Sequence, residues 1–255
     1  MIRIHHLNCG TLLVANYPTV VCHCLLLEDP NGLALVDTGI GLLDVQSPLE
    51  RLGQPLIEMA GFQFNEHDTA VRRIERFGFS PNDVRHIILT HCDPDHAGGL
   101  ADFPHATVHL AEEELANVQS GSLRYVPTQF AHSPRWQPVS QSQHDWLGLS
   151  ARSVPLGFSS EVLLVPLFGH TAGHCGVAIR QDKQWMLHAG DAYYLRAELT
   201  TDDHPVSALA AARADDDHSR RVSLGHLRRL NNELSDVVQI IGYHDLTELP
   251  NGLTQ

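Results

Sequence analysis

The sequence predicts an α/β fold of four layers, in which two mixed β-sheets pack together and helices cover their outer sides. Strand-like and helix-like runs occur in both halves of the chain, which indicates two sheets with helices outside them. At 255 residues the chain is long enough for one large domain with a substantial core. Hydrophobic residues make up 43% and charged residues 18%, which is typical of a globular protein. We therefore expect a single domain over residues 1–255.

The chain opens with short strand-like runs that predict an antiparallel sheet. Runs over residues 10–14 and 20–27 are separated by turns, and the Asn-Gly pair at 31–32 is a hairpin signal. The apolar run 33–36 continues this sheet. It stops at 37–39, a polar Asp-Thr-Gly break where we expect a loop.

Helices and strands then alternate. Apolar residues recur at helical spacing over 66–77, and a turn leads from there into an apolar strand over 84–90. A strand over 107–110 is followed by a helix over 111–118. The second half predicts a mostly helical stretch at 204–234 and strands at 162–167, 177–180, 184–188 and 237–241.

Two segments lack a clear period. Residues 40–65 are rich in Gly, Pro and isolated apolar groups, and residues 121–160 hold aromatic, Pro and Gln residues. Long segments without periodicity in a compact domain are typical of functional loops. We expect both segments to cover a substrate pocket.

Charge and cysteine usage exclude several classes of function. The formal net charge of −13 excludes a phosphate-binding surface, which needs clustered Lys and Arg. Residues 1–7 lack the features of a secretory signal, and no apolar run approaches membrane-spanning length. The five cysteines form no C-x-x-C pair or regular framework, which favours a reducing compartment. We expect a cytoplasmic protein that acts on a small molecule and binds neither nucleic acid nor a membrane; the oligomeric state stays open.

The strongest local signal directly follows the apolar strand at 84–90. The segment 90–99 reads Thr-His-Cys-Asp-Pro-Asp-His-Ala-Gly-Gly and offers His91, Asp93, Asp95 and His96 within six positions. A strand alternates its faces and cannot point four side chains at one place, whereas a tight loop at a strand end can. This segment therefore predicts a cation site.

Three more polar clusters also follow strands. They are Gly169-His170-Thr171-Ala172-Gly173-His174, His188-Ala189-Gly190-Asp191 and Gly242-Tyr243-His244-Asp245. A single His beside Gly usually serves only a turn, and a single Asp commonly caps a helix. Four such clusters at successive strand ends instead indicate one shared metal site.

With these clusters the chain resembles the metallo-β-lactamase superfamily, whose signature is His-x-His-x-Asp-His followed by a His, an Asp and a last His on separate loops. The match spans nearly the whole chain and implies that family's fold and two divalent metal ions. The loop at Asp37 is similar to the family's early Asp loop, which supports the metal loops by hydrogen bonds. The implied ligands are His91, Asp93 and His170 for one ion, Asp95, His96 and His244 for the other, and Asp191 between them.

The sequence departs from the family signature at one position, because Asp93 stands where the second His is expected. An added carboxylate hardens the site and shifts metal preference from zinc toward iron or manganese. Zinc remains favoured, with iron and manganese as alternatives. His174 and His188 are left out of the ligand set, because neighbouring polar residues more often orient the ligands.

A pair of cations would lower the pKa of a shared water, which would attack a carbonyl while Asp95 passes the proton to the leaving group. In N-acyl homoserine lactonases, a branch that this chain resembles, a Tyr three residues after the bridging Asp contacts the substrate carbonyl. Tyr194 occupies that place here. Lactone hydrolysis is therefore the leading reaction.

Three alternatives stay open from the sequence. A glyoxalase-II-like thioesterase would use the same chemistry on a thioester. A diiron redox centre is favoured by Asp93, but the chain has no room for an attached flavin domain. A metal-bound protein could also sense a ligand without turning it over. The residues that would shape the pocket give no means to identify the substrate.

Overall fold

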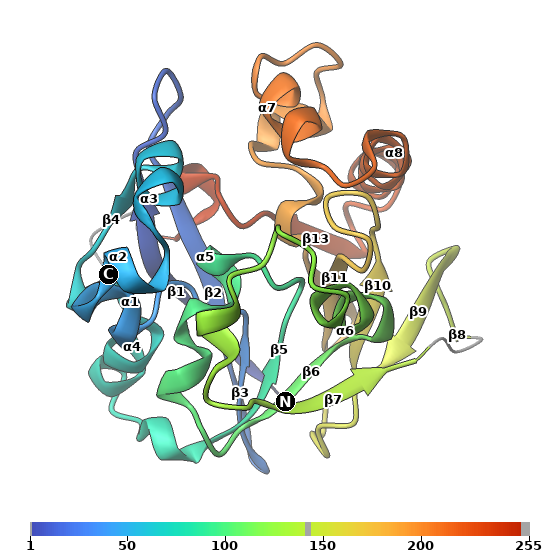
Figure 1. The fold of residues 1–255 in the computed structure, drawn as a ribbon. Helices are drawn as coiled ribbons and strands as arrows, with labels where there is room; N and C mark the ends of the chain where they lie inside the picture. Colours follow the sequence, from blue (N-terminus) through green and yellow to red (C-terminus); the bar gives the residue numbers. More distant parts are fainter. Residues whose placement is uncertain (1, 141–143, 251–255) are drawn as a thin grey trace.

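The computed structural model describes residues 2–140 and 144–250, and two β-sheets form its centre (Figure 1). In spatial order, the first sheet holds β4 (Phe62–Gln63), β1 (Arg3–Leu12), β2 (Val20–Asp29), β3 (Gly32–Val36), β5 (Val84–Ile88), β6 (Thr107–Ala111) and β7 (Arg135–Val139). The second sheet holds β13 (Val238–Ile241), β12 (Gln184–His188), β11 (Cys175–Gln181), β10 (Val162–Pro166), β9 (Leu149–Ser153) and β8 (His144–Trp146). Both sheets contain parallel and antiparallel pairs, so both are mixed.

Helices cover the outer side of each sheet. The α-helices are α1 (Leu42–Gln46), α2 (Pro48–Arg51), α3 (Gln54–Ala60), α4 (Ala70–Arg76), α5 (Pro94–Ala97), α6 (Glu112–Gln119), α7 (Val206–Arg213) and α8 (Asp217–Glu233). The short 3₁₀ turns are η1 (Glu66–Asp68), η2 (Pro81–Asp83), η3 (Gly98–Asp102), η4 (Pro127–Phe130), η5 (Gly190–Ala192), η6 (Arg196–Leu199) and η7 (Leu246–Glu248). Val71 and Ile74 of α4 pack on the first sheet, and Leu224 and Leu227 of α8 pack on the second. The four-layer α/β fold expected from the sequence is confirmed.

The alternation of side chains along the strands divides the core into layers. On β2, Leu25 and Leu27 face the second sheet, whereas Leu26 faces the outer helices. On β10, Leu164 points into the space between the sheets and Leu163 points toward α8. Because successive residues of a strand point to opposite faces, each central strand needs apolar residues on both sides. This explains why these strands read as continuous apolar runs.

Strand direction brings several strand ends to one edge of the molecule. β3 and β5 run parallel, and so do β12 and β13, so each pair ends on the same side. β10 pairs with β11 in antiparallel fashion, with Pro166 opposite Cys175, so the segment that joins them lies at the same edge as the end of β12. The polar clusters of the sequence all follow these strand ends.

Three segments differ in detail from what the sequence predicts. Residues 204–234 form two helices, because the Asp216 side chain accepts hydrogen bonds from the backbone N–H groups of His218 and Ser219 and starts α8 there. Residues 40–65 form the short helices α1 to α3 and strand β4 instead of an open loop. Residues 121–160 supply η4 and strands β7 to β9, which extend both sheets.

The partly buried carboxylate of Asp102, beside α1, gives a prediction about stability. The Asp102 carboxylate accepts a hydrogen bond from Leu42 N at 3.0 Å, but burial and the nearby Asp44 raise its pKa to about 6. The folded state thus holds a proton that the unfolded state has released, so stability falls as the pH rises from about 4 to about 6. Asp102→Asn keeps an acceptor for Leu42 N and removes the charge.

We expect Asp102→Asn to stabilise the protein by about 1 kcal/mol above pH 6 and to have little effect near pH 4. Denaturant unfolding of both proteins at pH 4, 5, 6 and 7.5 measures this difference. A gain that is equal at all four pH values would show that the charge of Asp102 is not its cause.

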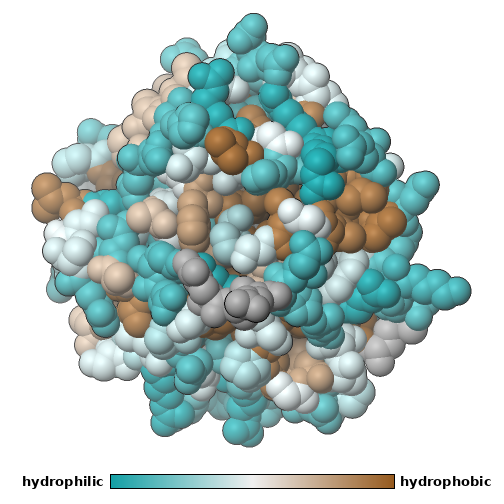
Figure 2. Space-filling model, turned by 90° about the vertical axis from the view of Figure 1, so that its right-hand side faces the viewer, coloured by the Kyte–Doolittle hydropathy of each residue, from teal (hydrophilic) through white to brown (hydrophobic). Residues whose placement is uncertain are grey.

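Hydrophilic side chains cover most of the face shown in Figure 2, and apolar side chains reach the surface near its middle. Exposed large apolar side chains include Leu13 at 52% and Met59 at 51%, which come from the β1–β2 hairpin and α3. Within residues 2–140 and 144–250, no helix is long and apolar enough to cross a membrane.

Candidate metal centre

The loop after β5 turns sharply and packs against the loop after β3. Its backbone passes so close to residues 38–44 that a Cβ on Gly98 would lie 2.3 Å from an Asp44 carboxylate oxygen, and one on Gly99 would lie 2.7 Å from the Thr38 carbonyl oxygen. Only glycine fits such an approach. This contact places α5, with Asp95 and His96, beside the end of β3.

Four imidazole rings from three segments converge on the carboxylate of Asp191. Its oxygens lie 3.3 Å from the Nε2 atoms of His96, His170 and His244, and 4.0 Å from that of His91. Asp95 joins the cluster at 3.6 Å from His244 Nε2. Residues that are more than one hundred positions apart in the sequence therefore surround a single point.

Hydrogen bonds on the far side of three rings fix their orientation. His96 Nδ1 donates to Asp37 Oδ2 at 2.9 Å, His244 Nδ1 donates to the Val21 carbonyl at 3.0 Å, and His91 Nδ1 lies 3.1 Å from Thr90 Oγ1. A proton on Nδ1 leaves the lone pair on Nε2, the atom that faces Asp191. These hydrogen bonds thus orient the three rings so that Nε2 faces Asp191, where it can bind a metal once it carries no proton.

The Asp37 carboxylate accepts several of the hydrogen bonds that hold the metal-centre loops in place. One carboxylate oxygen accepts from Thr90 N at 2.8 Å, and the other accepts from Thr90 Oγ1 at 2.8 Å and from His96. Its backbone φ is 56°, in the left-handed region that Asp tolerates better than most residues. The supporting role that the resemblance implied for the Asp37 loop agrees with these contacts.

The donor atoms at the centre fit a bound cation. His91 Nε2, His96 Nε2 and Asp191 Oδ1 are buried and have no hydrogen-bond partner among the described residues. Buried polar atoms are rarely left in this state, so each such atom needs an explanation. Two groups of three residues have ligand atoms within 4.8 Å of one another: His91, His170 and Asp191, and Asp95, His96 and His244. Mixed imidazole and carboxylate sets of this kind suit zinc and similar ions.

Burial and charge set the protonation of the centre. Burial, together with the nearby His96, lowers the pKa of His91 well below its usual value, so this ring is neutral. Burial would raise the pKa of Asp191, but His244 and His96 outweigh it and hold that pKa well below its usual value. A neutral imidazole and an ionised carboxylate are the forms that bind metals.

Asp93 lies beside the first group but has a different main partner. Its oxygens are 3.5 Å from His91 Nε2 and 3.3 Å from His170 Nε2, yet both oxygens also accept hydrogen bonds of 2.6 Å from Arg124. Although burial opposes it, the Arg124 guanidinium holds the pKa of Asp93 well below its usual value. The ligand assignment from the sequence did not anticipate this ion pair.

The sequence reasoning missed Arg124 and Glu114. The buried Glu114 carboxylate accepts hydrogen bonds from Cys92 N at 2.8 Å, Thr171 Oγ1 at 2.6 Å and Tyr125 Oη at 2.8 Å. It thereby joins the loop of His91 to the loop of His170. The only sequence signal for Glu114 is a run of three Glu residues at the start of a helix, which has a simpler explanation in the helix dipole.

The two histidines left out of the ligand set bond to the backbone. His174 Nε2 accepts from Asp191 N at 2.9 Å, and its Nδ1 lies 2.9 Å from the Leu167 carbonyl oxygen. His188 Nε2 lies 2.7 Å from the carbonyl oxygen of His23. His174 therefore positions the backbone of Asp191, and His188 ties the end of β12 to β2.

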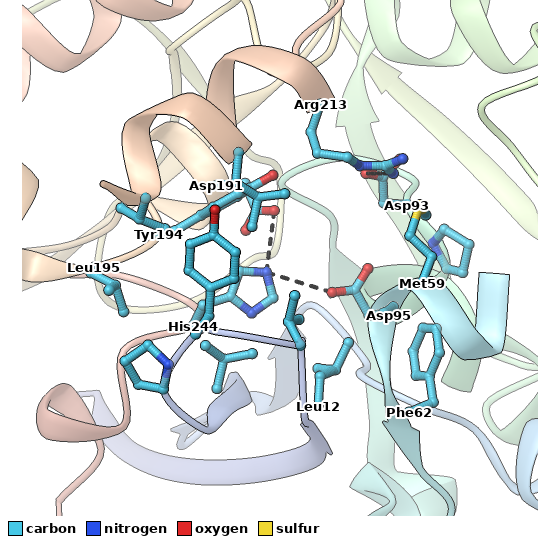
Figure 3. A pocket seen from close by; sticks show the side chains of 18 of the residues that line it. Leu12, Met59, Phe62, Asp93, Asp95, Asp191, Tyr194, Leu195, Arg213 and His244 are labelled. Atoms are coloured by element: carbon cyan, nitrogen blue, oxygen red, sulfur yellow. Dashed lines mark ion pairs between the residues drawn. The ribbon is translucent and has the colours of Figure 1, made fainter. Parts of the chain in front are cut away.

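An apolar pocket opens beside the centre, and Figure 3 shows His244 between Asp191 and Asp95 on its floor. The Tyr194 ring stands next to His244, with ring centroids 5.4 Å apart. No hydrogen bond joins the Tyr194 hydroxyl to another described residue. The apolar wall consists of Leu12, Val14, Tyr17, Pro18, Val20, Leu56, Met59, Ala60, Phe62, Leu195, Val206 and Leu209.

Of the two segments without a clear period, one contributes residues to the lining of the pocket. Leu56, Met59, Ala60 and Phe62 come from the segment 40–65, which therefore contributes to the pocket. None of the lining side chains comes from the described part of 121–160. Arg124 of that segment instead reaches the centre from the side of Asp93 and His170.

Comparison with known proteins connects this geometry to a family. Residues 17–234 match the family described as the metallo-beta-lactamase superfamily. A probable metallo-hydrolase of Mycobacterium tuberculosis is 40% identical over 205 residues, which cover 78% of this chain and 64% of that protein. The chain thus spans less than two thirds of that relative. An N-acyl homoserine lactonase of Bacillus cereus is 33% identical over 117 residues, or 43% of this chain and 44% of the lactonase.

Solved structures show the same fold at lower identity. An N-acyl homoserine lactone hydrolase with the product N-hexanoyl-L-homoserine bound at its catalytic metal centre aligns with a TM-score of 0.72 and 20% identity, over 96% of this chain and 93% of that one. A dizinc quorum-quenching lactonase aligns with a TM-score of 0.60 and 17% identity, over 90% of this chain and 74% of that one.

Proposed function

Because the chain belongs to the metallo-beta-lactamase superfamily, we propose that it is a two-metal hydrolase that opens lactone rings, with N-acyl homoserine lactones as its substrate class. The observation that carries the proposal is the convergence of His91, His96, His170 and His244 on Asp191 at the floor of an apolar pocket. The named lactonases among its relatives support the choice of a lactone.

The residues present would hold two ions in the groups already described. Divalent cations there would supply Lewis-acid chemistry, which acidifies water and polarises a carbonyl group. Asp191 lies within reach of both groups, so it would join them. Asp93 would be a further ligand of the His91 and His170 group. Zinc is the proposed metal, with iron or manganese as the alternatives that Asp93 favours.

Two side chains would act on the substrate directly. Water adds to the carbonyl carbon, the ring C–O bond breaks, and the alcohol oxygen that leaves needs a proton. Asp95 lines the pocket and its carboxylate lies 3.6 Å from His244 Nε2, so it is placed to pass that proton on. The free Tyr194 hydroxyl would donate a hydrogen bond to the carbonyl oxygen.

The apolar wall would receive the acyl chain. Burial of methylene groups against Leu12, Met59 and Phe62 stabilises a bound acyl chain by roughly 0.8 kcal/mol per CH₂. Affinity should therefore rise with acyl length until the wall is covered.

A substrate panel on protein of known metal content tests the proposal. We expect turnover of N-acyl homoserine lactones, with kcat/KM that rises from short to medium acyl chains, and little turnover of thioesters, β-lactams or phosphoesters. Protein treated with a chelator should lose activity and regain it with Zn²⁺. Cleavage of thioesters but of no lactone by the metal-loaded protein would reject the lactone assignment.

Tyr194→Phe tests the role of the hydroxyl. We expect kcat on a lactone to fall about tenfold, because a hydrogen bond to developing negative charge is lost, while metal content stays unchanged. Tyr193→Phe is the matched control, since the Tyr193 hydroxyl lies 3.0 Å from the Glu248 carboxylate and serves the fold. Equal effects of both variants on kcat would remove Tyr194 from the mechanism.

A further inference from the structure

We propose that Arg124 is a resident cation that makes the two halves of the metal centre unequal. An ion fills the group of Asp95, His96 and His244 first, and Arg124 opposes loading of the group of His91, His170 and Asp191. This inference rests on the proposed two-metal function and adds an order of filling to it.

All the donors of the Arg124 guanidinium are used. Nε and Nη2 donate to the two oxygens of Asp93 at 2.6 Å each, and Nη2 also donates to His170 Nε2 at 2.8 Å. Nη1 donates to the Arg213 carbonyl at 2.6 Å and to Asp215 Oδ1 at 3.2 Å. A guanidinium has five N–H donors, so this set satisfies it completely. The side chain is only 9% exposed.

Asp215, which accepts a hydrogen bond from Arg124 on the side away from the centre, is itself held by other hydrogen bonds. Asp215 Oδ2 accepts hydrogen bonds from Ala172 N at 3.0 Å and from Asn117 Nδ2 at 3.2 Å. These contacts tie the segment between α7 and α8 to the loop of His170 and to α6. Arg124 is therefore held from the side away from the centre and would lose several charge-assisted bonds if it moved.

The hydrogen bonds of Arg124 fall on one half of the centre only. In the first half, the His170 Nε2 lone pair accepts from Nη2, and both oxygens of Asp93 are engaged. In the second half, the charged groups beside His96 Nε2 and His244 Nε2 are carboxylates, with Asp191 at 3.3 Å from each and Asp95 at 3.9 and 3.6 Å. An ion that enters the first half must therefore displace Arg124 from His170, whereas no guanidinium has to be displaced from the histidines of the second half.

Electrostatic repulsion by Arg124 also favours filling of the second half before the first. A fixed positive charge within hydrogen-bond distance of two ligands repels a divalent ion, and the effect is large in a buried site with low effective dielectric constant. Removal of the guanidinium would also free the charge of Asp93 to attract an ion. Both effects predict that removal of Arg124 increases the affinity of the first half for a divalent ion.

Zinc titration of metal-free full-length protein against a chromophoric chelator tests this order. For the wild type we expect two classes of site, one tight and one weak. In Arg124→Gln we expect the zinc dissociation constant of the weak class to fall by about tenfold or more, while that of the tight class changes little. In Arg124→Lys, which keeps the charge, the weak class should stay close to that of the wild type.

Arg213→Gln is the matched control, because its guanidinium approaches Asp93 only to 4.0 Å and is 36% exposed. We expect its weak class to tighten far less than that of Arg124→Gln. Asp215→Asn weakens the hold on Arg124 and changes no proposed ligand, so it should lower the dissociation constant of the weak class in part. It provides the test if Arg124→Gln fails to fold.

The possible results separate the two proposals. Two equal classes in the wild type, or a weak class that does not tighten in Arg124→Gln, would overturn the role of Arg124 and leave the two-metal hydrolase intact. Wild-type protein that binds none of zinc, iron and manganese would reject the two-metal function itself.

Discussion

Asp191→Ala is expected to lower hydrolysis of a lactone by at least about 100-fold and to remove most of the bound metal. The Asp191 carboxylate lies 3.3 Å from three imidazole nitrogens and belongs to the cluster that offers ligands to both halves of the centre. Substitution of residues that merely support ligands already costs 10–100-fold in metal affinity or activity. Loss of a shared ligand should cost more, since both proposed sites depend on it.

Metal content per protein and kcat/KM on the same preparation measure this effect. Asp203→Ala, which removes an exposed carboxylate outside the centre, is the control and should change neither value. Asp191→Ala should still fold, because Asp191 lies in the short turn η5 after β12 and its substitution leaves the packed strands in place. A variant that keeps its metal and full activity would refute the assignment of Asp191.

Asp37→Ala is expected to weaken zinc binding by about 10–100-fold although Asp37 is no ligand. The substitution leaves Thr90 N and His96 Nδ1 without their acceptor. His96 then loses the hydrogen bond that fixes its tautomer. Because buried groups lose their partners, we also expect the free energy of unfolding to fall by about 3 kcal/mol.

A second buried aspartate separates these two effects. Asp29 is the last residue of β2 and accepts hydrogen bonds from Asn31 N and Ser159 N at 3.0 Å, but it lies outside the metal centre. Asp29→Ala should destabilise the fold and leave zinc affinity unchanged. If both variants weakened zinc binding in proportion to their loss of stability, Asp37 would have no specific role in orienting His96.

The sequence determined the arrangement of layers and the gathering of the histidines. Apolar runs such as β2 and β10 require burial on both faces, which only packed sheets with outer helices provide. Polar clusters that follow successive strands are then brought to one edge by strand direction. His91, His96, His170 and His244 could be expected at one edge from their positions in the chain, since each lies in a segment that follows a strand.

Only the tertiary structure decided which charges pair within that cluster. Arg124 lies 31 positions from Asp93, in a segment without periodicity, and nothing in its local sequence points toward the centre. Its place depends on how η4 and the segment between α7 and α8 dock around the loop of His170. Strand ends are set by local patterns of apolar residues, whereas the packing of loops depends on contacts between distant segments. For that reason the sequence predicted Asp93 as a metal ligand but could not reveal that a guanidinium holds it.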